Sequence, residues 1–451
     1  MRYIPNTPDD RQAMLRDIGV SSFEDLLKPI PKSLRLSRPL NIPKGKSEQE
    51  VVATMTSLAR KNLDAASFLS FLGAGSYDHY VPAAVGDLAG RSEFLTAYTP
   101  YQPEVSQGTL QVIYEFQSMI CELFRMNAAN ASLYDGGTAL AEAVMLAQSH
   151  TRRSRVLWFD SVHPHYRKVT RTLGDPLGIR FDTMPLTDGR VKDAALDSTL
   201  DVETAAVVFQ YPNFFGLIEH LEPLIERVHA AGALAIVVAD PLAMGVLEPP
   251  GNWDADIVVG EGQALGNPQS YGGPYLGLFA VSEKLVRRAP GRIAGITRDV
   301  DGRRGYVLTL QTREQHIRRD KATSNICTNE GLCATRATIF LSLVGPQGLR
   351  EIGETCMKNC NYLRNKLSEI PGVQLLFDGL HFKEFVFRLK GDVPAFLEFM
   401  AKRDILPGIP LKRFNMGLDD ALLVALTERR TADEMDRYAD AVRAFLKGSP
   451  S

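Results

Sequence analysis

Two hydrophobic patterns alternate through the middle of the chain, and together they predict a sheet covered by helices. Short apolar runs bounded by polar residues or glycine are typical of buried strands. Such runs occupy residues 155–159, 179–183, 205–209, 234–239 and 256–259. The segment 219–231 instead has helical spacing and ends at Gly232. Strands that alternate with helices predict an α/β fold with a large, doubly wound, mostly parallel sheet.

The two ends of the chain follow other patterns. Residues 1–70 combine helix-start signals at Thr7 and Ser22 with a proline-rich stretch, so we expect an N-terminal arm there. Such an arm either wraps a partner chain or packs on its own large domain. After residue 320, a long helical stretch broken near Gly345 leads to apolar runs and to a last helix that opens at Thr431. We therefore expect an arm (1–70), a large domain (71–320) and a smaller C-terminal α/β domain (321–451).

Composition narrows the class of protein. The 451 residues include 51 basic and 53 acidic side chains, a net charge of -2 that favours neither nucleic acid nor a membrane as partner. The 5 cysteines are too few for a disulfide framework, and no apolar run reaches membrane-spanning length. The N-terminus lacks the apolar segment of a signal peptide, so we expect a cytoplasmic protein. Cys356 and Cys360 stand four apart without further ligands, so we expect no metal site there.

Candidate chemistry begins where the apolar run 234–239 ends, at Asp240. The carboxyl end of a central parallel strand is where sheets of this class bind ligands. A glycine-rich loop at 260–277 follows, and glycine allows a ligand or another chain to approach the backbone closely. We therefore expect a binding site at this edge of the sheet.

Two further groups of residues are candidates for the binding site at this edge of the sheet. Gly136, Gly137 and Thr138 open a helix, where free N–H groups and a hydroxyl suit a phosphate, although these residues also start ordinary helices. His163 follows the apolar run 155–159, and it either stacks on a flat ligand or is structural.

Polar side chains also concentrate in two loops away from these strands. Tyr98, Tyr101 and Glu104 lie on a proline-stiffened loop, and Asn325 lies in a basic and then small polar stretch, 311–328. Ordering such groups on rigid loops is costly without a function, which favours a catalytic or partner surface. The alternatives are that the loops join the two domains, or that the basic stretch is a solvated helix face.

The order of strand, Asp240, short strand and glycine-rich loop resembles pyridoxal-phosphate-dependent enzymes of the aspartate aminotransferase type (fold type I). The resemblance implies that Asp240 pairs with the pyridinium nitrogen and that the helix start at 136–138 cradles the phosphate. It also implies a lysine that carries the cofactor at the head of the loop. Gln263 stands at that place, and no lysine occurs between Lys192 and Lys284.

Longer runs identify a narrower resemblance. The run Tyr-Thr-Pro-Tyr-Gln-Pro-Glu at 98–104 and the run Lys-Ala-Thr-Ser-Asn-Ile-Cys at 321–327 are the most specific. With the runs at 1–5, 134–138, 260–266 and 426–431 they resemble the glycine decarboxylase (P-protein) family of the glycine cleavage system, in its two-chain form. The similarity covers nearly the whole chain and is to the first, or alpha, chain, which also lacks the lysine.

This resemblance implies an oxidoreductase subunit that decarboxylates glycine and transfers the aminomethyl group to the lipoyl group of the H-protein. Pyridoxal phosphate would be held by a beta chain, in a heterodimer or a heterotetramer. Tyr98, Tyr101, Glu104 and Asn325 would then support the partner's site, and Gly136, Gly137, Thr138, His163, Asp240 and Gln263 would form a vestigial pocket. Two alternatives stay open, a non-catalytic docking subunit and an independent enzyme that uses another lysine.

Overall fold

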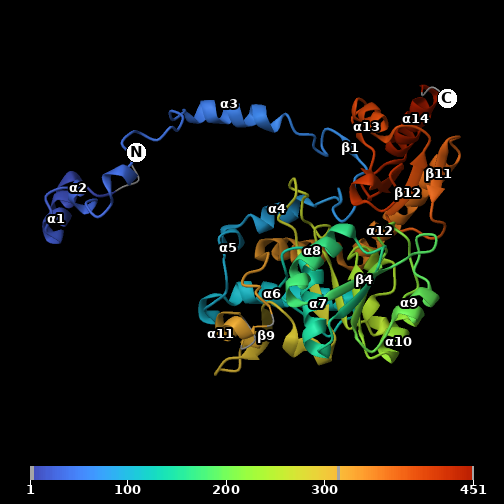
Figure 1. Ribbon diagram of the computed structural model, residues 1–451, viewed down its shortest axis with the longest axis horizontal. Coiled ribbons are helices and arrows are strands. Elements are labelled where there is room, and N and C mark those ends of the chain that lie inside the picture. Colours follow the sequence, from blue (N-terminus) through green and yellow to red (C-terminus); the bar gives the residue numbers. More distant parts are fainter. Residues whose placement is uncertain (1–4, 312–314, 323, 449–451) are drawn as a thin grey trace. The chain divides into compact units, whose positions relative to one another are not determined.

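The computed structural model describes residues 5–311, 315–322 and 324–448, and the chain divides into the units Met1–Leu63 and Asp64–Ser451 (Figure 1). The first unit contains helices α1 (Pro8–Ile18), α2 (Phe23–Leu26) and α3 (Glu48–Ala59). The predicted helix starts at Thr7 and Ser22 are confirmed, because each residue caps its helix through a capping box. None of the three helices contains a buried residue.

A 7-stranded sheet forms the centre of the second unit, in the order β2-β8-β7-β6-β5-β3-β4. The strands are β2 (Ala128–Ala129), β3 (Arg155–Phe159), β4 (Arg180–Met184), β5 (Thr204–Tyr211), β6 (Leu234–Ala239), β7 (Ile257–Glu261) and β8 (Gly277–Val281). Strands β3 to β7 are parallel, as predicted, whereas β8 runs antiparallel to both β7 and β2. The sequence did not predict β8, because it lies at the end of a glycine-rich stretch.

Helices cover both faces of this sheet, and strand alternation decides which residues face which helix. Val207 and Val237 share one cluster with apolar side chains of α6 (Gln107–Phe124), α10 (Glu222–Ala230) and α12 (Gly331–Ser368). Their neighbours Val208 and Ile236 share a second cluster with α7 (Gly136–Thr151). Helix α8 (Pro164–Gly174) packs beside α7 (Figure 1). The 7-stranded sheet therefore lies between two layers of helices.

A smaller, 4-stranded antiparallel sheet follows α12, in the order β11-β12-β15-β14. Its strands are β11 (Val373–Leu376), β12 (Glu384–Leu389), β14 (Ile409–Pro410) and β15 (Ala421–Ala425), with helices α13 (Val393–Ala401) and α14 (Ala432–Gly448). The predicted break in α12 is confirmed at Gly345, whose backbone is not helical (φ 59°, ψ -175°). The predicted cap at Thr431 is also confirmed, since Thr431 and Glu434 exchange hydrogen bonds.

Shorter elements complete the chain. They are β1 (Leu69–Ser70), α4 (Ala83–Ala89), α5 (Ser92–Leu95), α9 (Asp193–Thr199), the hairpin β9 (Ile293–Arg298) with β10 (Arg304–Thr309), α11 (Gln315–Arg318) and β13 (Ile405–Leu406). Strand β1 pairs with β13, so residues 69–70 join the C-terminal part of the fold. A membrane-crossing helix is absent from the described residues, since none of their helices is both long and apolar enough.

Candidate active site

The carboxyl ends of the parallel strands surround a small cavity, as the sequence pattern predicts. Asp240 directly follows β6, Glu261 ends β7, and His163 lies in the turn between β3 and α8. All three line a cavity of about 50 Å³, together with Tyr77 and Lys383. A space of this size holds a few water molecules and is far smaller than an ordinary ligand pocket of roughly 300 Å³ or more.

The N-terminus of α7 is satisfied by carboxylates of the same chain. Gly136 N–H donates to Glu261 Oε2 at 3.0 Å, and Thr138 N–H donates to Asp135 Oδ1 at 2.7 Å. Glu261 Oε1 also accepts from the N–H groups of Gln263 and Leu276, at 2.9 Å each. Burial raises the pKa of Glu261 to about 8, although these three N–H donors favour its charged form. Two of the donors that suit a phosphate, the N–H groups of Gly136 and Thr138, therefore already have an acceptor.

His163 has both ring nitrogens engaged within the chain. Its Nε2 lies 2.8 Å from the carbonyl oxygen of Ala74, and its Nδ1 accepts from the N–H of His165 at 3.1 Å. The ring stacks on Tyr166, with centroids 4.3 Å apart and planes 17° apart. A Cβ at Gly136 would come within 2.6 Å of the Tyr166 hydroxyl, so Tyr166 also requires the glycine at the start of α7. His163 and Gly136 are thus linked through one aromatic ring.

Gln263, at the place of the expected lysine, is buried and fully hydrogen-bonded. Its Oε1 accepts from Tyr77 N–H at 2.9 Å, while its Nε2 donates to the carbonyl oxygens of Tyr77 and Asn267, at 3.2 and 2.7 Å. The side chain therefore holds the segment around Tyr77 against the glycine-rich loop. An amide suits this place because it both donates and accepts.

The sequence did not predict the part that Lys383 plays in this site. Its side chain is 2% exposed, and its Nζ lies 2.7 Å from Asp240 Oδ2 and 3.6 Å from the centre of the Tyr77 ring. Lys383 directly precedes β12, so this ion pair joins the large sheet to the small one. The adjacent Glu384 accepts from Ala74 N–H and from the Tyr77 hydroxyl, at 2.7 and 2.8 Å. The only local signal in the sequence is a pair of charged residues, Lys383 and Glu384, at the start of an otherwise mostly apolar strand.

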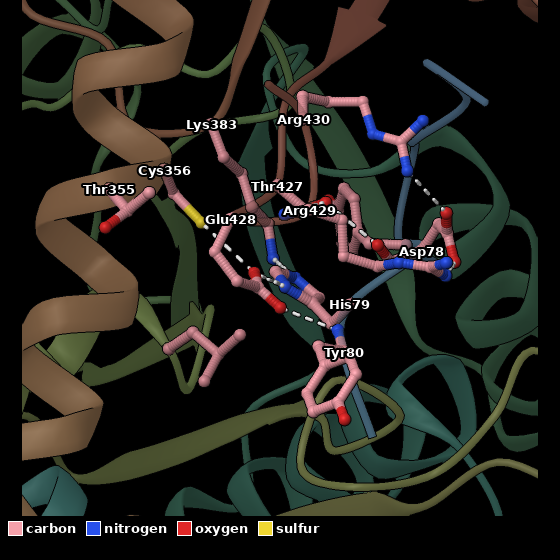
Figure 2. Close-up of polar contacts among 12 residues, drawn as sticks. Asp78, His79, Tyr80, Thr355, Cys356, Lys383, Thr427, Glu428, Arg429 and Arg430 are labelled. Atoms are coloured by element: carbon pink, nitrogen blue, oxygen red, sulfur yellow. Dashed lines mark hydrogen bonds and ion pairs between the residues drawn. The ribbon is translucent and has the colours of Figure 1, made fainter. Parts of the chain in front are cut away.

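A hydrogen-bonded chain of side chains continues from Lys383 (Figure 2). Its Nζ lies 3.1 Å from His79 Nε2, and His79 Nδ1 lies 2.7 Å from Glu428 Oε2. Burial and the Lys383 ammonium lower the pKa of His79. Although burial alone raises the pKa of Glu428, the bonds from His79 and Tyr80 N–H lower it to about 2. Cys356 on α12 joins the group, with its Sγ 3.7 Å from Glu428 Oε2.

His79, Cys356 and Glu428 also have the side-chain types of a metal site, with ligand atoms within 4.8 Å of one another. Because an ammonium can only donate, His79 Nε2 must accept from Lys383, and its Nδ1–H then donates to Glu428. The positive charge of Lys383 and these occupied lone pairs oppose a cation. We therefore interpret the group as a hydrogen-bonded support for Lys383.

The loops of the second candidate group lie elsewhere. Tyr98 and Tyr101 are 75% and 61% exposed, and Glu104 and Asn325 are also exposed. None of these four is among the described residues that line the cavity at Asp240. The structure therefore separates the predicted residues into a buried cluster at the sheet edge and an exposed group on the loops.

Comparison with known proteins matches this chain to one protein family. A model of the glycine cleavage system P-protein matches residues 1–442. A relative from Desulforamulus reducens, described as a probable glycine dehydrogenase (decarboxylating) subunit 1, is 50% identical over 445 residues, 99% of this chain and 100% of the relative. A relative with the same description from Moorella thermoacetica is 49% identical over 446 residues, again 99% and 100% of the two chains.

Solved structures agree with the fold. A crystal structure of a glycine decarboxylase (P-protein) of the glycine cleavage system, in inhibitor-bound form, has a TM-score of 0.90 at 44% identity, covering 98% of this chain and 100% of that one. A glutamate decarboxylase from Lactobacillus brevis has a TM-score of 0.69 at 13% identity, covering 92% and 96%, and supports the fold alone. The predicted pyridoxal-phosphate enzyme fold (fold type I) is confirmed.

Proposed function

Because this chain belongs to the glycine cleavage system P-protein family, we propose that it is the alpha subunit of a two-subunit glycine decarboxylase. The predicted family resemblance is confirmed by a match over residues 1–442 and by relatives whose full length the chain covers. The description of those relatives as subunit 1 supports a partner subunit. In this proposal the pair decarboxylates glycine and passes the aminomethyl group to the lipoyl group of the H-protein.

One observation supports different roles for the two subunits. At the place of the cofactor lysine, this chain has the buried amide of Gln263, whose hydrogen bonds are all made within the chain. Lys383 does not substitute for it, because its ammonium is paired with Asp240. We therefore assign pyridoxal phosphate to the partner subunit, where it supplies the electron sink for loss of the carboxylate. This disfavours an independent enzyme that uses another lysine.

The exposed loops are the part of this chain best suited to reach the partner's site. Tyr98, Tyr101, Glu104 and Asn325 present hydroxyl, carboxylate and amide groups outside the buried cluster. Placed over the partner's cofactor, such groups orient glycine and the lipoyl arm and exclude water from the reaction. The polar groups on this surface favour an active-site role over that of a docking subunit alone.

The test is exchange of labelled carbon dioxide with the carboxyl group of glycine, in the presence of lipoylated H-protein. We expect no exchange with this chain alone and full exchange when it is mixed with its purified partner. Exchange by this chain alone would show an independent enzyme. Equal exchange by the partner alone and by the mixture would show that this chain takes no part in the reaction.

A further inference from the structure

The residues at the sheet edge do not fit pyridoxal phosphate. In enzymes of this fold the cofactor needs a free carboxylate for its ring nitrogen and free donors for its phosphate. Here Asp240 Oδ2 is taken by Lys383 and the N–H of Gly136 is taken by Glu261. The remaining cavity, of about 50 Å³, is lined by both Asp240 and Lys383.

We infer that the chain occupies its own cofactor site, with the Lys383 ammonium in place of the pyridinium nitrogen and the Glu261 carboxylate in place of the phosphate. Each substitute occupies the bonding position of the group it replaces: the Lys383 ammonium pairs with Asp240, and the Glu261 carboxyl group accepts from the N–H of Gly136 at the N-terminus of α7. The aromatic ring of Tyr166 stacks on His163, and the same ring lies close against Gly136. The side chains that replace the cofactor come from three separate segments, at 166, 261 and 383.

The network around Lys383 shows that its position is built. His79 accepts one of its protons and is itself fixed by Glu428, as Figure 2 shows. The Tyr77 ring lies 3.6 Å from the ammonium on another side. These contacts hold the Lys383 ammonium in one position, against Asp240. A lysine that merely fills space does not need three positioning residues.

The substitution has a mechanical consequence, because Asp240 belongs to the large sheet and Lys383 to the small one. The bond joins the two domains without any ligand. Asp78 adds to this connection by pairing with Arg429 and with Arg430, the latter at 3.2 Å (Figure 2). The site thus serves as a permanent connection between domains, where a cofactor-binding chain has a ligand pocket.

Pyridoxamine 5′-phosphate is a suitable probe, because it carries the ring nitrogen and the phosphate but has no aldehyde to react with surface lysines. We compare the full chain with Lys383→Ala, Glu261→Gln and the double variant, by equilibrium dialysis and by the change in Tm on adding the probe. We expect no retention by the wild type and about one equivalent retained by the double variant, with a raised Tm. Lys402→Ala, which removes an exposed lysine paired with Glu398, is the matched control and should behave as wild type.

Stoichiometric binding by the wild type would overturn the inference, and so would a folded double variant that retains no probe. A double-mutant cycle covers the case in which that variant does not fold. Lys383→Met leaves the partly buried Asp240 carboxylate without its cation, so it should lower Tm more than Lys383→Met combined with Asp240→Asn. Additive effects in this cycle would overturn the connection between domains. The inference rests on the fold, so these measurements on the single chain are independent of the carbon dioxide exchange that tests the proposed function.

Discussion

A buried ion pair such as that of Lys383 and Asp240 contributes little net stability, because desolvation of the two charges offsets their attraction. Removing one partner is nevertheless costly, since the other charge is left buried. The same reasoning applies to Glu261, whose three backbone donors would lose their acceptor. These side chains are therefore best understood as fixing one arrangement of the site.

Buried His163 should make the folded state sensitive to acid. Burial lowers the pKa of His163 to about 4, below its unfolded value of about 6.5. Because folding lowers this pKa, the stability that depends on neutral His163 is fully present above about pH 6.5. It is lost progressively as the pH falls from there through about 4. His163→Asn should therefore reduce the loss of unfolding free energy between about pH 7.5 and pH 5.5 by about 1 kcal/mol. Urea unfolding at both pH values measures this, and an unchanged loss in the variant would contradict it.

Glu104→Gln tests whether the exposed loop supports catalysis, because it removes a charge and keeps the shape. We expect glycine decarboxylation by the assembled complex to fall about tenfold, corresponding to about 1.4 kcal/mol. The Tm and the affinity for the partner should stay unchanged, since Glu104 is exposed. Exposed Glu398→Gln on α13 is the control and should keep full activity. Normal turnover with a lowered Tm would instead indicate that the loop only joins the domains.

At the scale of elements, the break in α12 depends on Gly345. Its φ of 59° and ψ of -175° lie in a region that is open almost only to glycine. A Cβ added there meets nothing within 4 Å, so Gly345→Ala introduces backbone strain alone.

We expect this variant to lower the free energy of unfolding by about 2 kcal/mol. Gly86→Ala is the matched control: its Cβ also meets nothing within 4 Å, but Gly86 lies inside α4 without a positive φ. It should be neutral or stabilising by up to about 1 kcal/mol. Equal effects of the two variants, measured by denaturant unfolding, would show that the break does not require glycine.

Local patterns were sufficient for elements whose signal is continuous in sequence. Strand β6 and Asp240 could be predicted, because six apolar residues end at a carboxylate. Strand β8 could not, because its glycine-rich approach is typical of a loop. The hairpin of β9 and β10 was missed as well. Alternation and propensity do not reveal strands whose place is decided by their neighbours.

The candidate site was predictable only in part, for a similar reason. Asp240, Gly136 and His163 follow strands or start helices, so local pattern places them at one edge. Lys383 is 143 residues beyond Asp240 in the numbering, and no local pattern connects the two. Side-chain contacts between distant segments depend on the packing of the whole domain, which the sequence pattern does not describe.

At the scale of the whole molecule, the first unit is the part least supported by its own core. Helices α1 to α3 contain no buried residue, and Val51, Val52, Met55 and Leu58 on α3 are exposed apolar side chains. An apolar helix face of this kind suits a partner chain. We therefore favour the hypothesis that this arm wraps a partner chain over the hypothesis that it packs on its own large domain.

Removing residues 1–63 tests this preference. We expect the truncated chain to keep the Tm of the full chain and to bind the partner subunit at least about tenfold more weakly, a loss of about 1.4 kcal/mol. Sedimentation of the mixed subunits measures the affinity, and calorimetry measures Tm. A large fall in Tm with unchanged affinity would show that the arm supports its own domain. The double variant Val51→Ser and Met55→Ser should reproduce a smaller part of the same loss.

The ion pair of Lys383 and Asp240 has a consequence for the supply of the protein in a growing cell. A chain that binds a cofactor gains stability by mass action, about 2.7 kcal/mol when the ligand is in hundredfold excess over its Kd. A chain whose site is closed by its own side chains has a stability that does not depend on the concentration of such a ligand. Its abundance should therefore stay constant when the vitamin precursor is scarce, while the level of the cofactor-bearing subunit falls. During recovery, a reserve of this chain would be ready to pair with each newly loaded partner.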